Sequence, residues 1–226
     1  MKKREQGDSD SILKNIGATK LSVSTIGILG GIISMEHGIF EILHGNVPTP
    51  GIIIDAIGPE QRFWEEGGEM ALTIIPNFLI TGICAVIIGL ITILWIIRYL
   101  DKKYGSSGLI LLTVLTLLVG GGIAFFIFGI INGIVSTKIN KPLTMQRLLS
   151  TKSLPILSKL WVFCLPTAVI CSSIAILIAI FGIPFLTPDT TTDTAYVFGF
   201  MMIGFSILTY ITGFAREILN TQKQNP

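Results

Sequence analysis

Four ionisable side chains within one apolar stretch are the residues best suited to chemistry in this chain. Residues 21–45 read LSVSTIGILGGIISMEHGIFEILHG and include Glu36, His37, Glu41 and His44. The stretch is long enough to cross a bilayer, because a spanning helix needs roughly 20 predominantly apolar residues. Ionisable groups at membrane depth are costly, so they usually face a bundle interior or a wet cavity and mark a functional site. We therefore expect a polar site within this helix.

Helical spacing places three of these side chains on one side of the helix. At about 100° per residue, His37, Glu41 and His44 fall within an arc of about 60°. Small residues lie beside them: Gly27, Gly30, Gly31, Ser34 and Gly38. They allow close helix contact, and we expect that contact within the chain. The opposite side carries large apolar residues suited to lipid. Glu36 falls on that lipid-facing side, where the sequence predicts no partner for it.

A metal site is one interpretation of this pattern. The spacings from His37 to Glu41 and from Glu41 to His44 are i,i+4 and i,i+3, which bring side chains together. Glu-x-x-His also occurs in di-iron helical bundles. His37 and His44 lie about 10 Å apart along the axis, so one ion would take two of the three side chains. Further ligands would come from Asn77, the acidic segment 47–69 or a second protomer. A metal ion is the one cofactor that the sequence suggests.

A pathway for protons, ions or a small solute is the interpretation we favour. Histidine titrates near neutral pH, and a neighbouring carboxylate shifts that titration. We expect His37 and Glu41 to be the coupling pair, with His44, Asn77 and Glu36 supporting them. Asn77 enters the second apolar region at a similar depth, and Pro76 beside it would loosen the helical backbone there.

The alternative is a non-transporting structural or regulatory membrane subunit, in which the same side chains lock helices together. Polar contacts between membrane helices average well under about 1 kcal/mol, so such costly groups would be an inefficient lock. Metal binding is the third interpretation.

Composition places the chain in a membrane. Half of its 226 residues are hydrophobic, only 13% are charged, and the mean hydropathy is +0.75. A soluble domain carries about twice that charge. Basic residues stand in short loops, which excludes a nucleic-acid surface. The protease motif HExxH, the hydrolase motif GxSxG and paired aspartates within spans are all missing from the sequence, so the sequence indicates no catalytic residue, and whether the protein is an enzyme stays open.

Five hydrophobic regions predict an all-α, polytopic transmembrane helical bundle. The expected spans are 21–45, 70–100, 108–137, 160–185 and 195–215, within a membrane domain of residues 20–217. Residues 1–19 and 218–226 are expected to be cytoplasmic tails, the first of them flexible. The predicted location is the plasma membrane. The lipid bilayer is the expected partner, together with a second copy or another membrane subunit, because the chain is small.

Charge predicts the orientation of the bundle. Lys2, Lys3 and Arg4 place the N-terminus in the cytoplasm, and Arg216 places the C-terminus there. Segment 47–69 has five acidic residues and a single arginine, so we expect it outside.

The third hydrophobic region is difficult to place. It lies between two basic segments, which both favour the cytoplasm, and it contains Gly120, Gly121 and Gly122. Glycine is the residue most able to break a helix. One interpretation is a pair of half-helices that enter and return on the same side, which is tolerated where protein buries the backbone. The other is one long helix with the glycines as a packing face. We expect residues 138–158 to form a basic connection on the inner surface, which agrees with the first interpretation.

Several short stretches resemble an uncharacterised group of prokaryotic multi-spanning membrane proteins. They are residues 36–43 (EHGIFEIL) with the following Gly45-Asn46, residues 75–77 (IPN), the triple glycine and residues 140–144 (NKPLT). The resemblance covers residues 21–165 and implies membrane residence, but no activity is established for that group. Prolines often follow the triple glycine there, whereas Phe125 and Phe126 follow it here, which counts against a broken helix.

Overall fold

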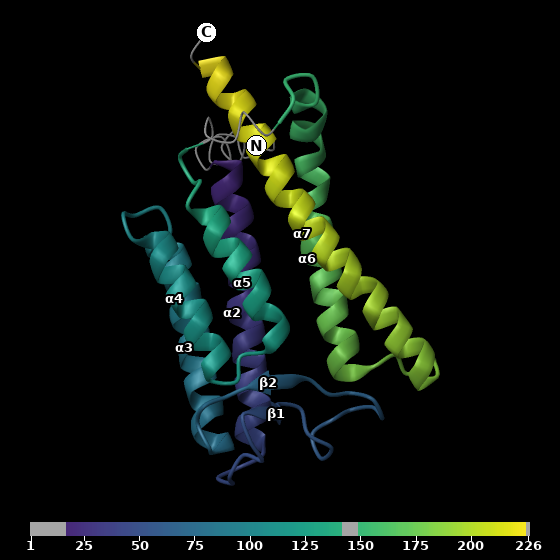
Figure 1. Cartoon of the computed structure of the whole chain (residues 1–226). Helices are drawn as coiled ribbons and strands as arrows, with labels where there is room; N and C mark the ends of the chain where they lie inside the picture. Colours follow the sequence, from purple (N-terminus) through teal and green to yellow (C-terminus); the bar gives the residue numbers. More distant parts are fainter. Residues whose placement is uncertain (1–16, 142–148, 225–226) are drawn as a thin grey trace, which may run out of the picture.

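The computed structural model describes residues 17–141 and 149–224, and they form a helical membrane bundle. Four of the described helices are long and apolar enough to cross a membrane: α2 (Ala18–Leu43), α3 (Phe78–Tyr99), α6 (Leu154–Phe181) and α7 (Pro188–Gln224). The start of α2 and the end of α7 lie at one end of the bundle, here called the terminal end (Figure 1). The predicted all-α, polytopic class is confirmed.

Glycines bring α2 and α3 into close contact, as expected for small residues at membrane helix interfaces. A Cβ on Gly38 would lie 2.6 Å from the Gly82 carbonyl oxygen, and one on Gly31 would lie 3.0 Å from that of Gly89. Between these crossings, Ser34 Oγ donates a hydrogen bond to the Ala85 carbonyl at 3.3 Å. The glycine side of α2 is therefore occupied within the chain.

The third hydrophobic region is a helical hairpin. Helix α4 (Gly105–Leu118) and helix α5 (Ile123–Ser136) each contain 14 residues, or about 21 Å, which is less than the ~30 Å hydrocarbon core. Gly120 and Gly122 between them have φ values of 93° and 90°, which favour glycine and end the helix. Gly129 packs on Thr113 and Gly133 on Ile110, so the two helices run antiparallel. The prediction of two half-helices broken at the glycines is confirmed, and the single long helix is wrong.

A small two-stranded sheet covers the other end of the bundle, here called the sheet end. Strands β1 (Ile53–Asp55) and β2 (Met70–Leu72) pair antiparallel. The tip of the α4–α5 hairpin is fastened to this sheet, because the Gly120 N–H donates to the Leu72 carbonyl at 2.8 Å. The hairpin therefore enters from the terminal end and stops beneath the sheet.

Strand β2 corrects the predicted second span, which begins at residue 78 and not at 70. Asn77 is the N-cap of α3 and accepts a hydrogen bond from the Ile80 N–H at 3.1 Å. Pro76 therefore precedes the helix, and the prediction that it loosens a helical backbone is wrong.

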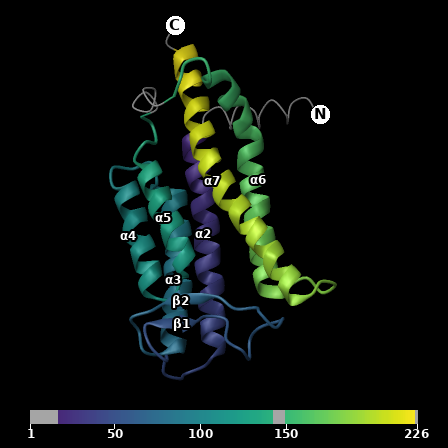
Figure 2. The same ribbon diagram turned by 45° about the vertical axis from the view of Figure 1, so that its right-hand side comes forward.

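Helices α6 and α7 form a long pair beside α2 (Figure 2). Both are longer than predicted, and α7 continues through the supposed tail to Gln224. The pair is fastened to α2 at the terminal end: Trp161 Nε1 donates to Ser22 Oγ at 2.9 Å, and Glu217 accepts from the Thr19 N–H at 2.9 Å. Residues 1–16 of the predicted tail 1–19 and residues 142–148 of the basic connection 138–158 lie outside the described residues.

The main hydrophobic core lies toward the terminal end. Its buried members come from α2, α3, α4 and α7 and from the turns beside them: Val23, Ile96, Leu100, Leu109, Ile139, Tyr210 and Phe214. Among the described residues, the apolar clusters at the sheet end are smaller and lie around Ile54 and Ile57. This difference leaves the ionisable side chains of α2 in the less densely apolar half of the protein.

Candidate functional site

His37 lies on the buried side of α2 and forms an ion pair with a carboxylate from outside the helix. Its side chain is 2% exposed, and Nε2 contacts the carboxylate of Glu69, which is 20% exposed. Glu69 directly precedes β2, and its carbonyl accepts a hydrogen bond from the Ala56 N–H at 2.8 Å. The sheet therefore holds this carboxylate over the helix.

Glu36 joins this pair, which corrects its predicted place on the lipid side. Its two carboxylate oxygens are buried and have no hydrogen-bond partner among the described residues. One potential ligand atom each from Glu36, His37 and Glu69 lie within 4.8 Å of one another. A helical projection shows lipid on that side because it cannot include the loop that carries Glu69. We call these three residues the acid–histidine cluster.

Glu41 is the most completely buried carboxylate beside the cluster. Its side chain is 0% exposed, and neither oxygen has a hydrogen-bond partner in the described part of the chain. The carboxylate lies against the backbone of Gly120, where a Cβ would meet Oε1 at 2.0 Å. It is also close enough to His37 for their charges to interact. His37 and Glu41, the expected pair, are therefore near enough to interact through their charges, and His37 makes a direct contact with Glu69.

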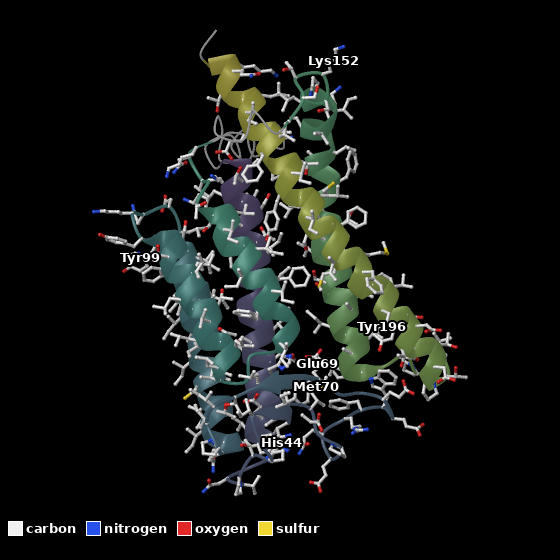
Figure 3. The ribbon with its side chains drawn as sticks, in the orientation of Figure 1. His44, Glu69, Met70, Tyr99, Lys152 and Tyr196 are labelled. Carbon is white, nitrogen blue, oxygen red and sulfur yellow. The ribbon has the colours of Figure 1, made fainter. Side chains whose placement is uncertain are left out.

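A cavity of about 600 Å³ opens beside the acid–histidine cluster. His37 and Glu69 form its polar corner, and the remaining wall is mostly apolar, with contributions from β2, the start of α5, α6 and α7. Figure 3 shows Glu69 and Met70 between α2 and the α6–α7 pair, with Tyr196 on α7. The cavity thus brings space for water or a solute to ionisable groups within the bundle.

His44 and Asn77 have other surroundings. The His44 ring stacks on Phe78, with ring centroids 4.2 Å apart, and its Nε2 is 3.2 Å from the Ala56 carbonyl oxygen. Asn77 Nδ2 donates to Asn46 Oδ1 at 2.8 Å. Neither residue lines the 600 Å³ cavity or belongs to the acid–histidine cluster. The side chains that lie together are thus Glu36, His37 and Glu69, and not the predicted metal set of His37, Glu41 and His44. Supporting roles for His44 and Asn77 stay predictions.

Two further cavities continue toward the terminal end. One of about 60 Å³ lies between α2, α5 and α7, and Met202 lines both it and the larger cavity. The other, of about 380 Å³, is lined by Asp101, Lys102 and the end of α5. Leu100, Leu109 and Ile139 of the main core lie at these last two cavities and close the space between them.

Comparison of the chain with protein-family models, curated proteins and solved structures finds no match. The helices identify an integral, multi-pass membrane protein of the helical class. Its site must therefore be interpreted from its own geometry.

Proposed function

We propose that the protein passes protons or small cations across the membrane, with the acid–histidine cluster as their entry site. The observation that carries this proposal is that His37 and Glu69, paired within a membrane bundle, line a cavity of about 600 Å³. A contact that only joins helices has no need of such a cavity, because packed protein interiors contain few voids larger than a water molecule.

The charge of the site favours a positively charged ligand. Glu36, Glu41 and Glu69 surround a single imidazole, so carboxylates outnumber cationic groups. A cleft lined by one sign of charge with low-dielectric walls concentrates ions of the opposite sign. A proton carried on His37 or a bound cation would each reduce the cost of burying Glu41.

The arrangement of cavities supports a pathway that is closed at one end. The large cavity, the 60 Å³ cavity and the 380 Å³ cavity follow one another from the sheet end to the terminal end. The apolar core closes the last step. Passage would therefore require a rearrangement around α5 and α7, which line the narrow cavity. By the charge rule the sheet end faces outward, and both chain ends face the cytoplasm of a plasma membrane.

Flux through purified protein in liposomes tests the proposal. A pH-sensitive dye inside the vesicles reports proton flux, and gradients of sodium, potassium and divalent ions test cation flux in separate experiments. We expect flux above that of empty vesicles in at least one of them. His37→Ala and Glu41→Gln should reduce this flux at least tenfold. The matched control is Glu60→Gln, which changes an exposed glutamate of the same acidic segment.

Unchanged flux in both variants, or no flux above empty vesicles in any arm, would contradict transport. The non-transporting structural or regulatory subunit would then be the better account of the same polar contacts.

A further inference from the structure

We infer that Glu36, His37 and Glu69 bind a divalent transition-metal ion of the Zn²⁺ or Mn²⁺ class, with an open coordination position toward the 600 Å³ cavity. The inference rests on the proposed function in one respect, which is that the bound ion is also the ion that passes along the pathway. The binding site itself is argued from the three side chains.

Geometry is the first support. The three potential ligand atoms lie within 4.8 Å of one another. Zinc binds nitrogen and carboxylate oxygen at about 2.0–2.2 Å, so two ligands of one ion stand up to about 4.2 Å apart. Binding one ion therefore requires the ligand atoms to move closer together by rotation of the two glutamate side chains. The ligands come from α2 and from the residue before β2. The Ala56 N–H holds Glu69 at the sheet, and His44 Nε2, 3.2 Å from the Ala56 carbonyl oxygen, connects the end of α2 to the same residue.

Uncompensated carboxylates are the second, independent support. Both oxygens of Glu36 and both oxygens of the fully buried Glu41 have no hydrogen-bond partner in the described residues. A buried charge without compensation is strongly unfavourable, by several kcal/mol in real proteins. His37 interacts with Glu36, Glu41 and Glu69 but carries at most one positive charge against the three carboxylates. A divalent ion bound between Glu36 and Glu69 offsets the remaining charge, directly for Glu36 and through the electrostatic field for Glu41.

The donor atoms restrict the kind of metal. One imidazole nitrogen with two carboxylates suits zinc, manganese and ferrous iron, whereas copper(I) prefers sulfur ligands. Calcium and magnesium take oxygen ligands. The three cysteines, Cys84, Cys164 and Cys171, are free thiols outside this cluster. Zn²⁺ should bind more tightly than Mn²⁺, following the general order of divalent affinities.

The number of protein ligands indicates an open coordination position on the ion. Structural zinc sites have four protein ligands, while sites with three keep a position for water or substrate. His37 and Glu69 both line the cavity, so that position has space beside it. Water or a further ligand can therefore reach the bound ion from the cavity.

Binding to metal-free protein in detergent tests the inference. Calorimetric titration with Zn²⁺ should show one ion per chain, and Mn²⁺ added to the same sample should bind at least tenfold more weakly. Glu36→Gln, Glu69→Gln and His37→Ala should each weaken Zn²⁺ binding at least tenfold, since each removes one of three ligands. Glu60→Gln is the matched control and should bind as the unaltered protein does. Size-exclusion profiles and thermal unfolding identify any variant that fails to fold, and the loop variant Glu69→Gln keeps the test decisive if the helix variants do so.

Absent or substoichiometric Zn²⁺ binding overturns the inference, as does binding that survives Glu69→Gln but is lost in His44→Ala. The two proposals fail separately. One Zn²⁺ bound per chain without flux contradicts transport and leaves the metal site standing. Proton flux with no metal binding contradicts the metal site and leaves transport standing.

Discussion

At the scale of single residues, a buried carboxylate of this protein packs against a glycine. Glu41 packs directly on Gly120, whose φ of 93° favours glycine. The same glycine ends α4 and donates its N–H to β2. One position thus breaks the helix, joins the hairpin to the sheet and leaves room for a charged group.

Gly120→Ala should therefore destabilise the protein. The positive φ alone costs on the order of 1–3 kcal/mol for a residue with a Cβ, and the new methyl group would also collide with the Glu41 carboxylate. Thermal unfolding in detergent should show a clearly lower midpoint. Gly204→Ala on an open face of α7 is the control and should leave the midpoint equal or slightly higher. Equal midpoints for Gly120→Ala and the unaltered protein would show that this close approach does not exist.

Asp101 at the terminal end gives a prediction about pH. Lys20 Nζ donates a hydrogen bond to it at 2.9 Å and holds the pKa of this carboxyl below its ordinary value of 3.8. Because the folded-state pKa is lowered, the stabilisation is present above pH 3.8 and is lost as the pH falls through the folded-state pKa.

The unfolding midpoint of Asp101→Asn should thus lie slightly below that of the unaltered protein at pH 7, with a smaller difference at pH 3. The effect is small because the two side chains are 32% and 34% exposed. Lys20→Gln should reproduce it. A difference that stays constant between the two pH values would contradict this account of the pair.

At the scale of elements, sequence patterns predicted what was local. Helix α2 followed from an apolar stretch of spanning length, whereas the charges at both ends of the α4–α5 hairpin left it as one of two interpretations. The start of α3 was missed because residues 70–72 are apolar in both a helix and a strand. Glu69 was missed as the partner of His37 because it comes from a loop, although the acidic segment 47–69 had been named as a source of further ligands.

Asn132 of α5 connects three helices. Its Nδ2 donates to the Val23 carbonyl of α2 at 3.1 Å, and its Oδ1 accepts from Tyr210 of α7 at 2.9 Å. A double-mutant cycle between Asn132→Ala and Tyr210→Phe should give a coupling free energy of about 0.6 kcal/mol, the average for membrane helix contacts. The exposed Tyr104→Phe, combined with Asn132→Ala, should give a value near zero. Equal coupling in both cycles would mean that the Asn132–Tyr210 hydrogen bond contributes nothing specific.

At the scale of the whole molecule, the two ends of the bundle differ. Tyr99 and Lys152 mark the terminal end and His44 the sheet end in Figure 3. The four long helices return the chain to its starting end, and the hairpin enters and leaves there too. The sequence indicated this topology because the charges of the loops can be counted without knowing how the helices pack. The position of the cavity could not be predicted in this way, because it depends on how α6 and α7 lie against α2.

Labelling of single cysteines tests this topology in cells, with the native cysteines replaced. An impermeant thiol reagent outside the cell should label Glu60→Cys and Asp193→Cys, and it should label Lys103→Cys and Ser150→Cys only after the cells are opened. All four residues are exposed. External labelling of Ser150→Cys together with protection of Lys103→Cys would mean that the hairpin crosses the membrane.

The central claim is that water or an ion reaches His37 through the cavity, and accessibility of the cavity wall measures this most directly. Ala175 on α6 lines the cavity, whereas Leu177 two residues along is 54% exposed on the outer surface of the bundle. In a chain without native cysteines, a charged methanethiosulfonate reagent added at the sheet end should modify Ala175→Cys within minutes and leave Leu177→Cys unmodified in the lipid. Equal resistance of the two thiols would show that the cavity is closed to water, and the ionisable groups would then serve only to hold the helices together.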